Sequence, residues 1–206
     1  GAGSDIISAT LVNAGNAALL NNFERISIKG ATDGGSLDAT LMTNSNITGL
    51  VVDGALSATS ANTFAVTNIS GSTSTIDVTA SNTNATFAAK LAVTTGTSDA
   101  TNINFASIGL STSASDTEKT TSLAGVSTTG VEAVNISSGG FVINAADFDT
   151  LPMLNTLTLL TDTGNTVKEV VISGGSALEL GTTSSVSRDA TTKAVTSLTW
   201  STDGIA

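Results

Sequence analysis

Apolar and polar residues alternate in many short runs along the chain. Phe23-Glu-Arg-Ile-Ser-Ile28 and Val131-Glu-Ala-Val-Asn-Ile136 show the pattern most clearly. A period of two is typical of a β-strand with one buried face. The pattern predicts strands at residues 23–28, 47–52, 64–69, 75–79, 91–95, 102–105, 131–136, 141–143, 154–159, 167–172, 177–180 and 195–200. Helical signal is confined to single turns at residues 16–21 and 147–154.

The spacing of these strands indicates how they are organised. Where the series is cleanest, strand starts lie 24, 23 and 28 residues apart (23 to 47, 131 to 154 and 167 to 195). That is the length of one coil of a repeat protein, and neighbouring coils would bury each other's apolar rows. We therefore expect an all-β fold, a parallel β-helix or solenoid-like stack of short strands with irregular loops. Tandem β-sandwiches, which also have many short strands, are the alternative.

Two regions differ in the quality of this pattern. Residues 1–86 form an N-terminal β region with weaker repeat patterning, and residues 87–206 form the clearer C-terminal solenoid region. Residues 107–129 are poor in strand pattern and contain the charge cluster Asp116-Thr-Glu-Lys119. They are predicted to be a loop or insertion.

Composition narrows the function classes. The 206 residues include no His and no Cys, which removes thiol and His-dependent catalysis, His- and Cys-based metal sites and disulfides. The net charge of −10 disfavours nucleic acid as a partner. Residues 1–206 contain no run of about 18 apolar residues, so insertion into a membrane is not expected. We expect a protein that is not an enzyme.

Calcium fits an acidic chain of this kind, because it needs only oxygen ligands. The sharpest candidate is Gly1-Ala-Gly-Ser-Asp5-Ile-Ile7, which matches most of the glycine- and aspartate-containing nonapeptide of calcium-binding β-rolls. In that motif Gly1 and Gly3 offer carbonyls and Asp5 a carboxylate. A glycine-rich turn before a strand is the simpler interpretation of the same residues.

Four further residues are candidate calcium ligands. Asp99 and Asn102 lie in a polar turn that runs into a strand, and Glu24 and Glu132 occupy the same place in two copies of the strand pattern. Asx residues also stabilise turns without any metal, and a Glu between apolar neighbours is often a solvated outward residue.

Several segments together resemble a known family. They are Gly1-Ala-Gly-Ser-Asp-Ile-Ile-Ser8, Leu20-Asn-Asn-Phe-Glu-Arg-Ile-Ser-Ile28, Gly96-Thr-Ser-Asp-Ala-Thr-Asn-Ile-Asn-Phe105, Leu123-Ala-Gly-Val126, Gly130-Val-Glu-Ala-Val-Asn-Ile136, Leu154-Asn-Thr-Leu-Thr-Leu159 and Val195-Thr-Ser-Leu-Thr199. The combination is similar to surface-layer (S-layer) proteins of Gram-negative bacteria of the Caulobacter and Campylobacter type. The similarity covers roughly residues 1–30 and 90–200.

This resemblance implies an RTX-like protein secreted through a type I channel that folds when it binds calcium. It would be extracellular, at the bacterial cell surface, and assemble with copies of itself into a two-dimensional lattice anchored on lipopolysaccharide through a region missing from this fragment. It implies calcium ligation by Gly1, Gly3 and Asp5, and by Asp99, Asn102, Glu24 and Glu132 in the turns. Thr199-Trp200 departs from the family, which commonly continues into an Asp at that point.

Two other functions remain open. A repeat module of a secreted adhesin would bind its ligand as a monomer, and residues 111–129 would be its natural contact surface. A hydrolase carried on a β-helix would require a pair of carboxylates in a groove, and the sequence shows no such spacing.

Overall fold

The computed structural model describes residues 4–57, 63–111, 120–144, 150–181, 185–188 and 195–199. Among them the chain is mostly β-structure with three short 3-10 helices, so the all-β prediction is confirmed. The helices are η1 (Ala9–Leu11), η2 (Ala17–Leu19) and η3 (Ala39–Leu41). The helical turn predicted at 16–21 is present as η2, whereas residues 150–154 of the second patch lie in strands or between them.

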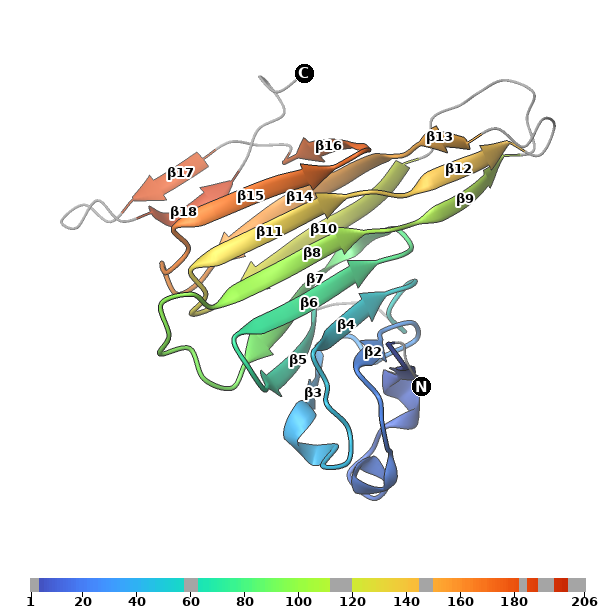
Figure 1. The fold of residues 1–206 in the computed structure, drawn as a ribbon, viewed down its shortest axis with the longest axis vertical. Helices are drawn as coiled ribbons and strands as arrows, with labels where there is room; N and C mark the ends of the chain where they lie inside the picture. The colour runs from blue at the N-terminus through green and yellow to red at the C-terminus, as the bar shows by residue number, and fades with distance from the viewer. Residues whose placement is uncertain are drawn as a thin grey trace.

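Two parallel layers make up most of the molecule (Figure 1). The first sheet has the order β1-β2-β4-β6-β8-β11-β15, and every neighbouring pair in it is parallel. Its strands are β1 (Ile6–Ser8), β2 (Arg25–Ser27), β4 (Gly49–Val52), β6 (Thr73–Val78), β8 (Ala100–Phe105), β11 (Ala133–Ser138) and β15 (Glu169–Gly174).

The second sheet lies behind the first in Figure 1. It has the order β17-β18-β14-β10-β7-β5-β3, and β16 also pairs with β14. Only β17 and β18 run antiparallel to their neighbours. The strands are β3 (Gly35–Asp38), β5 (Thr63–Ile69), β7 (Asn82–Leu91), β10 (Thr120–Thr128), β14 (Leu154–Asp162), β16 (Ala177–Leu180), β17 (Ser185–Arg188) and β18 (Val195–Thr199).

The chain alternates between the two sheets, from β2 to β3, β4 to β5 and β6 to β7. We call the run from one strand of the first sheet to the next a circuit. Side-chain contacts between neighbouring circuits span 19 residues at Asp5–Glu24, 27 at Asp77–Asn104 and 33 at Asn102–Asn135. The circuits therefore lengthen along the chain, and the longer ones contain the third sheet.

That third sheet has the order β13-β12-β9 and extends beyond β8 and β11 (Figure 1). Its strands are β9 (Ile108–Ser111), β12 (Phe141–Asn144) and β13 (Thr150–Pro152). Because β9 and β10 fall within residues 107–129, the loop predicted there is wrong for residues 108–111 and 120–128. Residues 112–119 lie outside the described part of the chain.

The register of the sheets places side chains of the same kind next to one another on adjacent strands. Ile7, Ile26, Leu50, Ile76, Ile103, Ile136 and Ile172 are successive partners in the first sheet. We call this row the inner column, and all its members before Ile172 are buried. A row in the second sheet, Phe64, Phe87, Val126 and Leu160, is also buried. The core lies between these rows, and aliphatic burial of this kind supplies most of the stability of such a fold.

The strand predictions failed at several places. β7 covers residues 82–91, where a strand was expected only from 91 to 95. This strand also crosses residues 86 and 87, where the sequence suggested a division of the chain. Its Asn, Thr and Ala residues give little alternation, yet Phe87 is fully buried.

Candidate functional site

The loops that enter the first sheet hold most of the predicted ligands that the structure describes. Asp5 immediately precedes β1, Glu24 precedes β2, Asp99 precedes β8 and Glu132 precedes β11. In-register parallel stacking therefore brings Asp5 beside Glu24 and Asp99 beside Glu132. Gly1 and Gly3 lie outside the described residues, so the nonapeptide is seen only from Ser4 onward.

The two pairs share one arrangement of hydrogen bonds, which we call the Asp–Glu corner. The backbone N–H of Asp5 donates to Glu24 Oε2 at 2.7 Å, and that of Asp99 donates to Glu132 Oε2 at 2.9 Å. The carbonyl of each Asp accepts two N–H groups of the next circuit, from Glu24 and Arg25 at 3.0 and 3.1 Å, and from Glu132 and Ala133 at 2.8 and 3.1 Å. Both Glu carboxylates thus stabilise the start of a neighbouring strand.

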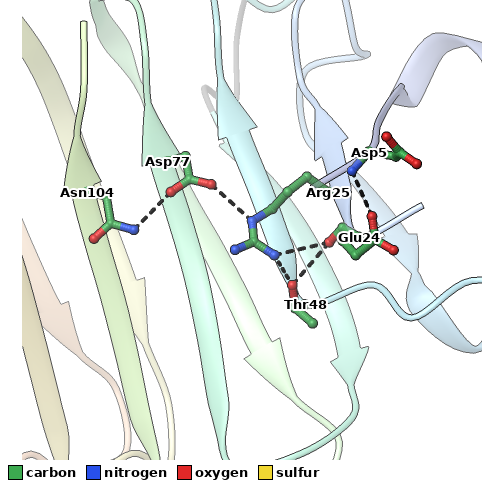
Figure 2. A network of polar contacts seen from close by, with 6 residues as sticks. All are labelled: Asp5, Glu24, Arg25, Thr48, Asp77 and Asn104. Carbon is green, nitrogen blue, oxygen red and sulfur yellow. Dashed lines mark hydrogen bonds and ion pairs between the residues drawn. The ribbon is translucent and has the colours of Figure 1, made fainter. Parts of the chain in front are cut away.

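The first corner continues into a polar network on the outer face of the first sheet (Figure 2). Arg25 reaches across β4 so that its Nε lies 3.0 Å from Asp77 Oδ2, and its guanidinium also donates to Thr48 Oγ1. Asn104 donates to the other Asp77 oxygen at 2.9 Å. Gly49 occupies the register position between Arg25 and Thr75, and its lack of a side chain leaves the path open.

Sequence reasoning missed this network. Arg25 and Asp77 are 52 residues apart and come together only because two intervening registers are fixed. The side chains are 16% and 27% exposed, so the ion pair is partly shielded from water and holds three circuits together. The repeated positions of β2 and β6 in the alternating pattern were the only available signal.

The second corner differs from the first by a carboxylate oxygen with no partner. Asp99 is 4% exposed, and its Oδ2 is buried without a hydrogen bond. A Cβ placed on Gly96 would lie 3.0 Å from both carboxylate oxygens, so the carboxylate folds back over its own loop. Most buried polar groups in proteins are satisfied, and a buried carboxylate normally pairs with a cation.

The loops of three consecutive circuits, which precede β8, β11 and β15, pack against one another. A Cβ on Gly130 would lie 2.6 Å from Thr94, and one on Gly164 would lie 3.0 Å from the Gly130 nitrogen. Thr166 lies in the third of these loops, and its Oγ1 is also buried without a hydrogen bond. Carboxylate, hydroxyl and carbonyl oxygens are the ligands that calcium takes, usually six to eight of them.

Asn102 lies apart from this corner chemistry. Its Oδ1 accepts a hydrogen bond from Asn135 Nδ2 at 2.9 Å on the outer face of the sheet. It is thus the start of a short amide ladder between β8 and β11. No group of three or more Asp or Glu side chains gathers in the described part of the chain, so a cation at the Asp99 corner would draw on neutral oxygens as well.

A pocket lies between η1 and β3, in the N-terminal part of the chain. Thr10, Asn13, Ser36 and Leu37 line it, and Asp38 is the one ionisable residue among the described residues of its lining. Hydrogen bonds from Thr40, then Asn68, hold the pKa of Asp38 below its usual value, so this carboxyl is ionised at neutral pH. The paired acid and base that a glycosidase needs are not present among these lining residues.

Comparison with known proteins gives no relative: no protein-family model, curated protein or solved structure matches the chain. None of the helices in the described ranges is long and apolar enough to cross a membrane.

Proposed function

We propose that this chain is a calcium-stabilised parallel β-helix that serves as a structural part of a bacterial S-layer protein. The alternating path through two parallel sheets and the in-register columns support the solenoid. The absence of His and Cys from the sequence, and the single carboxylate among the described residues that line the pocket beside η1, favour a structural role over a catalytic one. Extracellular location, assembly with copies of itself and anchoring on lipopolysaccharide belong to the same proposal, and rest on the resemblance of the sequence.

The observation that carries the calcium requirement is the buried, unpartnered Oδ2 of Asp99 beside Glu132. A carboxylate removed from water without a compensating partner destabilises the folded state. A cation at this corner removes that cost and binds only the folded chain, because the ligands come from different circuits. Binding of this kind raises stability as the free cation concentration rises.

Thermal unfolding in chelator and in millimolar calcium tests the proposal. We expect calcium to raise the melting temperature of the wild type by several degrees, and light scattering to show larger particles. Asp99→Asn should abolish most of the calcium-induced rise, and should melt no lower than the wild type in chelator, because it removes the buried charge.

Asp53→Asn is the matched control. Both Asp53 oxygens already accept hydrogen bonds, from Ser27 at 2.6 Å and from the Lys29 backbone at 3.0 Å. This variant should lower the melting temperature equally in chelator and in calcium, leaving the calcium-induced rise intact. Folding and particle size that are the same in chelator and in calcium would refute the calcium-dependent role.

An adhesin module remains the second candidate because of one apolar surface. Ile108 and Leu110 on β9 are 67% and 57% exposed, and their register partners on β12 are Phe141, 37% exposed, and Ile143. An exposed apolar face of this kind is typical of an interaction site. If the wild type stays monomeric in calcium at high concentration while a ligand protects this face, the adhesin function is favoured.

A further inference from the structure

The inner column ends in an exposed isoleucine. Ile136 on β11 is 1% exposed, whereas its partner Ile172 on β15 is 50% exposed. Ile172 has the same register position and residue type as its buried neighbours. β15 is the last strand of the first sheet, and nothing in the described residues pairs with its outer edge.

A second row of register partners lies beside the inner column, and we call it the outer column. Its residues are polar or glycine in the middle and aliphatic at both ends. Its members, in register order, are Ile6, Arg25, Gly49, Thr75, Asn102, Asn135 and Val171. Polar residues or glycine fill every middle position. The two end positions are aliphatic and exposed, Ile6 by 52% and Val171 by 41%. Terminal repeats of a stack usually have polar outer surfaces, whereas the two end strands of the described sheet have exposed aliphatic residues that another strand can cover.

The two end strands also match each other residue by residue. β1 reads Ile6-Ile7-Ser8 and the centre of β15 reads Val171-Ile172-Ser173. Neither triplet contains a charge, proline or bulge, the devices by which edge strands usually avoid pairing with another chain. Figure 1 places the N-terminal end of the chain and β15 toward opposite ends of the stack of strands.

We propose that β1 of a second copy of this chain adds in parallel to the free edge of β15. The register that continues the sheet places Ile6 of the second copy beside Val171, its Ile7 beside Ile172 and its Ser8 beside Ser173. The outer column, the inner column and the row that joins Ser8 to Ser173 then each continue into the second molecule. The contact buries the exposed aliphatic side chains at both ends and pairs the open backbone groups of β15.

Such a contact joins different surfaces of the two copies, so it repeats from copy to copy. Heterologous contacts form rings where the rotation closes and open rows where it does not. The contact deepens the proposed lattice role, on which its biological purpose rests, by naming one direction of assembly. It involves neither Asp99 nor Glu132 and therefore forms without calcium.

Directional cross-linking tests this contact. The sequence contains no cysteine, so an introduced thiol is the only thiol in its chain and any disulfide formed joins two copies at that position. Val171→Cys and Ile6→Cys proteins, prepared separately and mixed under mild oxidation, should form a disulfide-linked pair at least tenfold faster than either protein alone. Val93→Cys mixed with Ile6→Cys is the control, because Val93 is 62% exposed on the loop between β7 and β8, which are interior strands of their sheets.

Sedimentation of Ile172→Lys provides a second measurement, with Val93→Lys as its control. The wild type and Val93→Lys should grow in mass with concentration, in chelator as well as in calcium, while Ile172→Lys stays monomeric with a native circular dichroism spectrum. Cross-linking at the rate of the Val93→Cys control, or a wild type that remains monomeric in both conditions, would overturn the contact. Loss of the calcium response alone would refute the calcium-dependent role and leave this contact standing.

Discussion

The carboxylate side chains of this molecule have different roles, depending on which groups their oxygens contact. Glu24 and Glu132 accept backbone N–H groups of the preceding circuit, and Asp77 binds Arg25 and Asn104. Asp99 alone of these residues has a buried oxygen without a hydrogen bond. A carboxylate in a turn is therefore informative about metal binding only when its partners are known.

Asp38 gives a pH dependence at the residue scale. Its Oδ1 accepts hydrogen bonds from the Thr40 backbone at 2.9 Å and the Thr40 hydroxyl at 2.7 Å, which cap η3. With those from Asn68, they lower its pKa from the ordinary 3.8. Because the folded pKa is the lower one, the stabilisation is complete above pH 3.8 and is lost as pH falls through the folded pKa.

Asp38→Ser is the natural comparison, since Ser8 caps η1 in the same way, with its Oγ accepting from Thr10 N at 3.3 Å. We expect urea unfolding at pH 6 to show the wild type more stable than Asp38→Ser, and the difference to shrink as pH falls from 4 toward 2. A difference that is constant over this range would contradict the capping role of the ionised carboxylate.

At the scale of elements, Gly49 determines how closely β4 approaches β6. A Cβ added at Gly49 would lie 1.9 Å from the Thr75 carbonyl oxygen, so the two strands would have to separate. Gly49→Ala should lower the free energy of unfolding by about 3 kcal/mol. Gly175→Ala, where a Cβ would meet nothing within 4 Å, should change it by no more than about 0.5 kcal/mol.

Urea denaturation of the two variants measures these changes. Equal effects at Gly49 and Gly175 would show that the contact between β4 and β6 is looser than the structure has it. Gly49 also leaves the path of the Arg25 side chain open. Gly49→Ala should therefore weaken the ion pair between Arg25 and Asp77 as well, which adds to the expected loss of stability.

The sequence pattern predicted the elements better than their pairing. Alternation located β2, β4, β6, β8 and β11, because each of these strands has apolar residues at alternate positions that are buried in the core. It missed β7 and β10, whose Ala, Ser, Thr and Gly residues pack between neighbouring strands without strong polarity contrast. Small side chains suffice there because strands lie on both sides.

The candidate site was predictable as residues and not as contacts. Asp99 and Glu132 stand out as acids at strand starts, but they are 33 residues apart and meet only because neighbouring circuits are in register. The Asp99 loop and the Asp5 loop also start their strands two register positions apart, since Asp5 aligns with Thr101 and not with Asp99. Loop lengths set this offset, and periodicity does not reveal it.

At the scale of the whole molecule, each circuit contacts chiefly its two neighbours, so stability is close to a sum of circuit and interface contributions. Two isoleucines of the inner column differ in how many neighbouring circuits cover them. Ile103 is fully buried between β6 and β11, whereas Ile172 has a covering strand on one side only. The same residue type in the same register should therefore contribute very differently to the stability of the isolated chain.

We expect Ile103→Ala to reduce the free energy of unfolding by about 2–5 kcal/mol, through lost burial and the cavity left behind. Ile172→Ala should cost about 1 kcal/mol or less in dilute protein, where β15 is an open edge. Urea unfolding at several protein concentrations distinguishes the two. The cost at Ile172 should grow as association covers it, while the cost at Ile103 stays constant. A large cost at Ile172 that does not depend on concentration would mean that another part of the same chain already covers β15.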